Sequence, residues 1–160
     1  MDRYEYLNSD LIEHKKYILD SCHKMSKYLY KNGQEELSRE LLKRAFVHDD
    51  SKLNDEELKN FLELKIKDKP FINANSMLNE YEKERIQIHW KNNRHHPEYF
   101  DDIRDMEEID IIEMVCDWYA RSMQYGTDII EFAETRQKNR FNFPEDMFTK
   151  ILFYANILKK

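Results

Sequence analysis

Glycine and proline are scarce in this chain, and their scarcity limits the folds open to it. Only 2 glycines and 3 prolines occur among 160 residues. Sandwiches and barrels need many tight turns, which these two residues form most readily, so long helices are favoured instead. A chain of this length is the size of one ordinary domain. We therefore expect a single all-α domain over residues 1–160, a compact bundle of six or seven helices.

Apolar residues recur at steps of three and four along most of the chain, which is the spacing of an amphipathic helix. The expected helices run from Leu11 to a stop at Gly33, from Leu37 to Phe46, from Asn54 to about Lys67, from Asn75 or Ser76 to about His89, from Met106 to Tyr125, from Thr127 to about Gln137, and from Pro144 onward. The stretch 106–125 has almost no polar face, so it should be the central helix.

Capping and breaking residues mark several of the expected helix ends. Asn54, with Glu57 three residues later, has the pattern of a capping box, and Thr127 is a candidate N-cap. The Asp-Lys-Pro run at 68–70 should break the third helix, and Pro97 should either end the fourth or open a short helical turn. Residues after about 126 should complete the core or pack against a second subunit.

Charge and cysteine content bear on partners and compartment. The formal net charge of −6 disfavours binding to a nucleic acid polymer, which needs a basic face. The chain has no signal peptide, no apolar run of membrane-spanning length, and only two cysteines, Cys22 and Cys116. We expect a cytoplasmic protein without a membrane partner, in which local basic residues can bind one small anion and which can pair with a second copy of the chain.

The dipeptide His48-Asp49 is the centre of a candidate metal site. His14 lies on the apolar stripe of the first helix, and Asp117 lies inside the most apolar helix. A buried carboxylate needs a partner, which for Asp117 is either Arg121 one turn away or a metal ion shared with His14, His48 and Asp49. Imidazole and carboxylate ligands suit one or two divalent ions such as Mn, Fe, Co, Ni or Zn.

Other catalytic classes lack their sequence patterns. No histidine has a glutamate three residues before it, which excludes the Glu-x-x-His di-iron bundles. There is no His-Glu-x-x-His motif of a zincin and no Gly-x-x-x-x-Gly-Lys phosphate loop. A Ser-His-Asp triad is not excluded by residue order, but no Gly-x-Ser-x-Gly elbow supports one. His23 falls beside the apolar stripe and is expected to be an ordinary surface residue.

The ordered set His14, His48-Asp49 and Asp117 resembles the H, HD, D signature of the HD-domain metal-dependent phosphohydrolases, an all-α superfamily. The further histidines His89, His95 and His96 are similar to those of members with two metals. A finer pattern looks like that of a set of short bacterial and phage proteins within or near the superfamily: His14-Lys15, His48-Asp49-x-Ser51-Lys52 and His89-x-x-x-Asn93-x-His95-His96-x-Glu98-Tyr99. The resemblance implies hydrolysis of a phosphate ester, commonly a nucleotide. It also implies that His14, His48, Asp49 and Asp117 hold the first metal.

The same resemblance implies that His89 and one of His95 or His96 hold a second metal or donate a proton to the leaving oxygen. Lys52 lies one helical turn after His48, and Arg94 adjoins the histidine pair, so both cations can face a phosphate. The residues expected in catalysis are His89, His95 and Lys52. Those expected to bind the substrate are Lys52, Arg94 and His96.

Some expectations are less direct. Glu98 is a candidate to orient a ligand histidine, and Tyr99, Trp118 and Tyr125 are aromatic candidates for a base, although such residues more often form core. Many nucleotidases of the superfamily have a glutamate a few residues after the HD pair, where this chain has Asp50, Ser51 and Lys52. Two rivals therefore stand beside the hydrolase: an inactive protein that binds metal and a nucleotide, and an interaction protein whose histidines only form hydrogen bonds.

Overall fold

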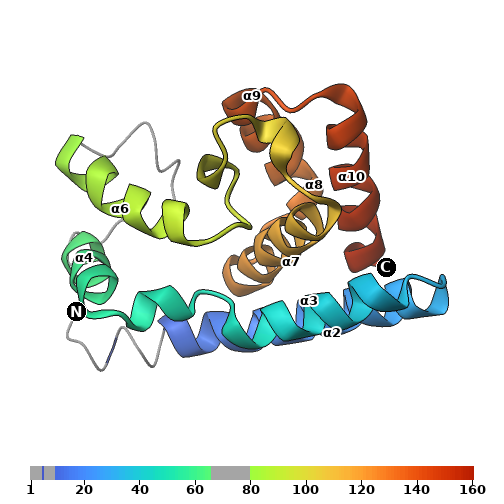
Figure 1. Cartoon of the computed structure of the whole chain (residues 1–160), viewed down its shortest axis with the longest axis horizontal. Coiled ribbons are helices and arrows are strands. Elements are labelled where there is room, and N and C mark those ends of the chain that lie inside the picture. Colours follow the sequence, from blue (N-terminus) through green and yellow to red (C-terminus); the bar gives the residue numbers. More distant parts are fainter. Residues whose placement is uncertain (1–4, 6–9, 66–79) are drawn as a thin grey trace.

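The computed structural model describes residue 5 and residues 10–65 and 80–160, which are helical or form turns and loops and contain no strand. The elements are α2 (Ile12–Lys31), α3 (Glu35–Val47), η2 (Asp50–Leu53), α4 (Asp55–Lys65), α6 (Glu80–Asn92), η3 (Pro97–Tyr99), η4 (Ile103–Asp105), α7 (Glu108–Tyr125), α8 (Ile129–Phe132), η5 (Ala133–Gln137), α9 (Lys138–Phe141) and α10 (Glu145–Lys159). The expected all-α class is confirmed (Figure 1).

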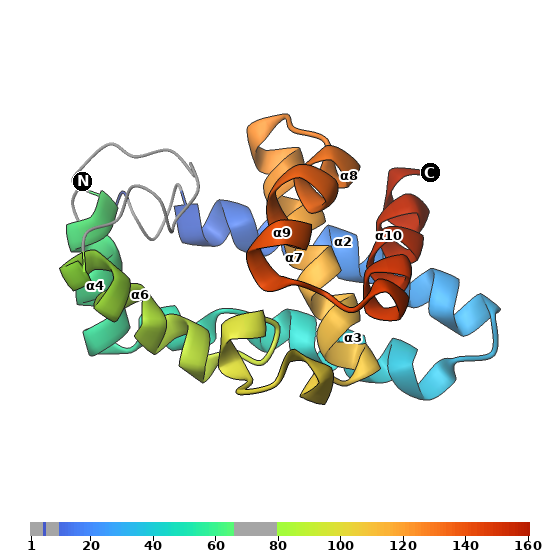
Figure 2. The same cartoon turned by 90° about the horizontal axis from the view of Figure 1, so that it is seen from above.

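Helices α2 and α3 form an antiparallel hairpin that runs along one side of the molecule (Figures 1 and 2). The turn between them contains Gly33 with φ of 77°, a left-handed conformation that glycine adopts without strain. Ser26 and Ser38 hydrogen-bond to each other at 2.7 Å between the helices. Because small side chains face each other here, the two helices lie close together, and the end of α3 delivers His48 beside the N-terminal half of α2.

The most apolar stretch of the sequence is the central helix α7, as expected. Its residues from Ile109 to Trp118 are all buried, and α7 packs against α2, α3 and α10. Glu107 and Asp110 form a capping box at its start, and Gly126 ends it with φ of 67°. Buried apolar residues of α2, α3, α7 and α10 join in one core cluster, so the C-terminal helix completes the core.

Helices α4 and α6 form an arm to one side of this core (Figure 1). They pack against each other, and α4 also contacts η2. Chain residues after α6 pass through His95 and His96 into η3, whose first residue is Pro97. Pro97 therefore opens a short helical turn, one of the two outcomes expected for it. The Asp-Lys-Pro run at 68–70 and the expected start at 75 or 76 lie outside the described residues.

The helical segment after Gly126 differs from expectation at both ends. Its N-cap is Asp128, not Thr127, because the Asp128 carboxylate accepts hydrogen bonds from the amides of Ile130 and Glu131. The segment continues beyond Gln137 to Phe141, through a π-helical turn at Ala133–Gln137. Such turns are frequently found at functional sites.

None of the helices in residues 10–65 and 80–160 combines the length and the apolar character that a membrane crossing needs.

Candidate metal centre

The histidines and aspartates singled out in the sequence meet in the interior. His14 comes from α2, His89 from α6 and Asp117 from α7, while His48 and Asp49 follow α3. His95 and His96 come from the loop after α6. Five elements or connections that are distant in sequence therefore contribute to one cluster, and its side chains are buried or nearly so.

Asp49 occupies the middle of the cluster because of its backbone. It has φ of 59°, a left-handed conformation that aspartate tolerates better than most residues other than glycine. The chain turns sharply at this point, between the end of α3 and η2. The Asp49 carboxylate is 3% exposed and has histidine nitrogens on several sides.

One group of ligand atoms consists of His14, His48 and Asp117, with Asp49 beside them. Asp117 Oδ1 lies 2.9 Å from His14 Nε2 and 3.6 Å from His48 Nε2. Asp49 lies 3.9 Å from His14 Nε2 and 3.7 Å from His48 Nε2. Ligand atoms that bind one ion at ~2.1 Å lie roughly 3 to 3.5 Å from their neighbours, so this group has the size of a metal site.

Both partners weighed for Asp117 have support: its carboxylate faces His14 and His48, as a shared ion requires, and although burial opposes the charged form of Arg121, the Asp117 charge raises the pKa of Arg121. Arg121 hydrogen-bonds to Gln124 at 3.1 Å and lies 4.0 Å from Asp10.

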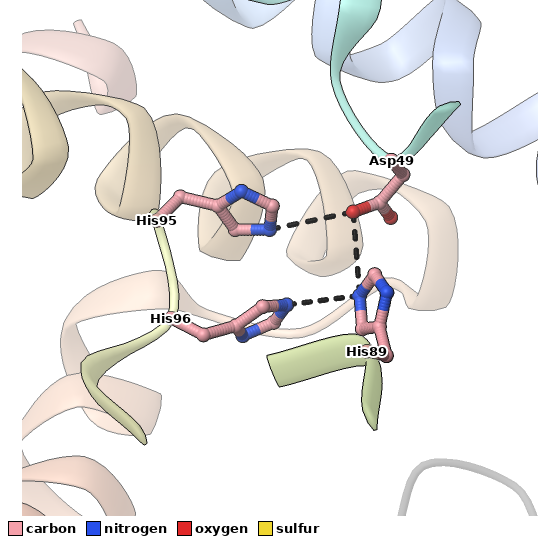
Figure 3. A group of neighbouring side chains, drawn as sticks. All are labelled: Asp49, His89, His95 and His96. Atoms are coloured by element: carbon pink, nitrogen blue, oxygen red, sulfur yellow. Dashed lines mark hydrogen bonds and ion pairs between the residues drawn. The ribbon is translucent and has the colours of Figure 1, made fainter. Parts of the chain in front are cut away.

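A second group consists of Asp49, His89, His95 and His96 (Figure 3). Asp49 Oδ1 lies 3.4 Å from His89 Nε2 and 3.4 Å from His95 Nε2. His96 Nε2 lies 3.0 Å from His89 Nε2. Both histidines of the pair therefore belong to this group, where the sequence had left one of them open. Asp49 is shared between the two groups, which places it where a carboxylate can bridge two ions.

Several buried polar atoms of the cluster residues have no hydrogen-bond partner among the described residues. They are His14 Nδ1 and Nε2, His48 Nε2, Asp49 Oδ1 and His95 Nε2. A buried polar atom without a partner costs free energy and calls for an explanation. Metal coordination would satisfy most of these atoms, and a mixed nitrogen and oxygen donor set suits Mn, Fe, Co, Ni or Zn. The residues present thus fit a divalent metal.

Glu113 orients two of the histidines and was not singled out in the sequence. Its Oε1 accepts a hydrogen bond from His48 Nδ1 at 2.9 Å and lies 3.5 Å from His95 Nδ1. Arg44 in turn contacts Glu113 at 3.2 Å. Because Glu113 holds the Nδ1 side of both rings, their Nε2 atoms point into the cluster. The sequence argument used for Asp117 would also have identified Glu113, because it too is a carboxylate inside the most apolar helix.

Glu57 plays the same part for His89, which corrects the capping-box interpretation. Glu57 Oε2 lies 3.0 Å from His89 Nδ1, and Asn92 donates to Glu57 Oε1 at 2.6 Å. The backbone amide of Asn54, which a capping box would join to Glu57, instead bonds to the Ser51 carbonyl. Since Glu57 is 2% exposed and faces a histidine, its carboxylate serves the cluster rather than the helix end.

The charges of the cluster shift its pKa values strongly. Burial alone would raise the pKa of Asp49, but Lys52 and His48 outweigh it and hold that pKa well below its usual value. Burial and the Arg121 charge lower the pKa of His14 to about 4. Burial opposes the charged form of His48, yet the carboxylates of Asp49 and Asp117 and the hydrogen bond to Glu113 raise its pKa to about 10. Without an ion, protons and Lys52 therefore balance the carboxylates.

Two cations expected to face a phosphate have other partners. Lys52 Nζ lies 2.6 Å from Asp49 Oδ2, and the Lys52 side chain is 6% exposed. Arg94 donates two hydrogen bonds to Asp110, from Nε at 3.2 Å and from the terminal nitrogen at 2.9 Å. Lys52 thus neutralises a candidate ligand and Arg94 ties its loop to α7, while the contact of either cation with a phosphate stays a prediction.

A cleft of about 530 Å³ opens beside the cluster, between α6, η3, α7 and the segment 129–141. His96 and Asp117 lie in its wall, so it touches both ligand groups. Glu98 also lines it, but forms an ion pair with Arg140, which corrects the expectation that Glu98 orients a histidine. Residues after 126 supply one wall, although nothing in their sequence indicated chemistry.

The chain was compared with known families and proteins. The model of a family of unknown function, DUF5662, matches residues 3–155. The comparison with curated proteins and the comparison with solved structures each gave no match.

Proposed function

The chain belongs to the DUF5662 family, and we propose that it is a metal-dependent phosphohydrolase that acts on a nucleotide or a related small phosphate ester. One observation carries the proposal: buried nitrogen and oxygen atoms without hydrogen-bond partners converge on Asp49, beside a cleft of substrate size. An ion bound there would lower the pKa of coordinated water toward roughly 7 and neutralise charge on phosphoryl oxygens.

Each side chain of the cluster has a part in this proposal. His14, His48, Asp49 and Asp117 would hold one ion, and Asp49, His89, His95 and His96 a second. Glu113 and Glu57 keep the imidazole Nδ1 atoms engaged, so the rings are oriented before a metal arrives. His96 and Asp117 form the boundary between the cluster and the cleft, where the phosphate of a substrate would arrive.

The arrangement of Lys52 supports one alternative. Its ammonium lies 2.6 Å from Asp49 Oδ2, where it competes with an ion for the carboxylate. A protein that binds a nucleotide without turnover is therefore the second candidate function.

Metal content and phosphate release test the proposal. The purified protein would be supplied with Mn, Co, Ni, Fe or Zn and assayed for bound metal and for phosphate release from mono-, di- and cyclic nucleotides. We expect bound metal and turnover, with both lost in His48→Ala. His23→Ala is the matched control, because His23 lies exposed on α2 outside the cluster. It should behave as the unchanged protein.

Three outcomes are distinct in this experiment. Turnover that survives in His48→Ala would contradict the assignment of the cluster. Nucleotide binding without turnover in the metal-loaded protein would favour the second candidate. A protein that takes up no ion and gains no thermal stability from divalent metals would contradict the metal centre itself.

A further inference from the structure

The cleft beside the cluster has the composition of a ligand site. Its volume of about 530 Å³ lies within the range of sites that enclose small organic molecules, roughly 300 to 1,000 Å³. One residue of each ligand group, Asp117 and His96, lies in its wall. A ligand in the cleft would therefore place one end against both groups, while the remainder extends along the cleft.

Aromatic rings line much of the cleft. They are Trp90, Trp118, Tyr125, Phe132 and Phe141. The Trp118 and Phe132 rings meet edge to face with centroids 5.6 Å apart, so the two rings hold each other in place. Flat, apolar walls of this kind favour a planar aromatic group, since stacking on them is tolerant of its substituents.

Three arginines also line the cleft, and their environments differ. Arg140 forms an ion pair with Glu98 and lies over the Trp90 ring. Arg136 is exposed to solvent. Arg121 follows Asp117 by one turn of α7, so its side chain projects from the same face of that helix. Its side chain is 12% exposed, which makes it the least exposed of the three and places it beside the cluster.

The charge of Arg121 reaches the cluster. Its partners include Gln124 at 3.1 Å and Asp10 at 4.0 Å, and its charge contributes to the lowered pKa of His14. A guanidinium matches two phosphate oxygens at once, and a partly enclosed one does so with little screening by water.

We propose that the cleft binds a phosphate monoester of a planar aromatic group, of which a nucleoside monophosphate is the representative. Arg121 contacts the phosphate beside His96 and Asp117, and the aromatic group lies against Trp118 and Phe132. This inference rests on the proposed function for the place of the phosphate. It assigns to Arg121 the part that the sequence had given to Lys52 and Arg94.

Intrinsic fluorescence can test this inference directly. The chain contains 2 tryptophans, and both of them, Trp90 and Trp118, line the cleft. The metal-loaded protein would be titrated with a nucleoside 5′-methylenephosphonate, which cannot be hydrolysed to nucleoside and phosphate. Ribose 5-phosphate, which lacks the base, serves as the second probe. We expect saturable quenching by the phosphonate and binding at least about tenfold weaker for ribose 5-phosphate.

Substitutions at the proposed phosphate contact and at the proposed aromatic contact refine the test. Arg121→Ala should weaken phosphonate binding by about tenfold or more, with partial recovery in Arg121→Lys. Phe132→Leu should weaken binding of the phosphonate by about fivefold and leave ribose 5-phosphate unchanged. Arg39→Ala, on the exposed surface of α3, is the control and should bind as the unchanged protein. Thermal melting would verify that each variant is folded.

The results separate this inference from the proposed function. The inference is wrong if ribose 5-phosphate binds as tightly as the phosphonate, or if the phosphonate causes no saturable quenching. Both results are obtained with the unchanged protein, so they do not depend on whether a variant folds. Phosphate release from simple esters in the same preparation would still support the hydrolase. Saturable quenching in a protein that releases no phosphate would support the cleft and contradict the hydrolase.

Discussion

At the scale of single residues, the carboxylates that bind the Nδ1 atoms of the histidines matter as much as the candidate ligands themselves. Glu113 contacts the Nδ1 atoms of both His48 and His95, and it lies beside Arg44. Burial opposes its charged form, yet the hydrogen bonds to His48 and His95 hold the pKa of Glu113 well below its usual value. It is therefore ionised at neutral pH and acts on the histidines as a negative charge.

Glu113→Gln should weaken metal binding while the fold is retained. The amide keeps the shape of the side chain but removes the charge that makes the imidazoles stronger ligands, and losses at such positions are about 10- to 100-fold in metal affinity. Calorimetric titration with Mn or Zn would measure the affinity. Glu36→Gln, on the exposed face of α3, is the control. An unchanged affinity in Glu113→Gln would show that the carboxylate does not act on the ligands.

Lys52→Met should have the opposite effect on metal affinity. The Lys52 ammonium lies 2.6 Å from Asp49 Oδ2 and is buried, so it repels an ion that approaches the same carboxylate. Two like charges at about 4 Å repel by at least ~1 kcal/mol, which corresponds to roughly fivefold in affinity. The same titration would detect the gain. A loss of affinity would instead mean that Lys52 holds Asp49 in its binding position.

At the scale of elements, periodicity predicts the helices well and their irregular ends poorly. The bounds of α2 and α7 follow from the apolar stripe and from the stops at Gly33 and Gly126. The cap at Asp128 and the π-helical turn after Phe132 depend on the local path of the chain, where neighbouring candidates such as Thr127 compete. Sequence patterns predict a helix after Gly126 but do not decide whether Thr127 or Asp128 caps it.

Gly126→Ala should destabilise the fold through the end of α7. Gly126 has φ of 67°, and an added Cβ would meet no atom within 4 Å, so the cost comes from the backbone alone. A residue with a side chain in this conformation costs about 1 kcal/mol. Denaturant unfolding would measure the change. Asn is tolerated better in this conformation, so Gly126→Asn should lose less stability than Gly126→Ala, and the reverse order would contradict the explanation.

At the scale of the whole molecule, the sequence predicted which candidate ligands come together better than it predicted the contacts around them. Rare residue types in apolar surroundings, such as Asp117, single out candidate ligands because a buried charge needs a partner. The partners of Lys52 and Arg94 are harder to predict, because Lys52 meets Asp49 only through the sharp local turn at η2 and Arg94 meets Asp110 only when its loop packs on α7. The cleft was likewise not predictable, since its walls come from α6, α7 and the segment 129–141 and form only when these meet.

The candidate metal ligands also come from both parts of the fold. His89 lies on α6, in the arm, whereas His14 and Asp117 belong to helices of the core. An ion shared through Asp49 would therefore fasten the arm to the core, and metal at 100 times its dissociation constant would stabilise the folded state by about 2.7 kcal/mol. Because the ion would bind atoms of both the arm and the core, it should stabilise α6 against local unfolding more than a helix that supplies no ligand.

Hydrogen exchange with and without Mn or Zn measures this coupling. We expect the backbone amides of Glu80–Asn92 to exchange more slowly when metal is added, while those of α10, which supplies no ligand to the cluster, change less. His89→Ala should remove the metal-dependent protection of α6 and keep much of that near His14, because the first ligand group remains complete. His23→Ala should retain both effects. Equal protection of α6 with and without metal would show that the arm and the core are not joined by the ion.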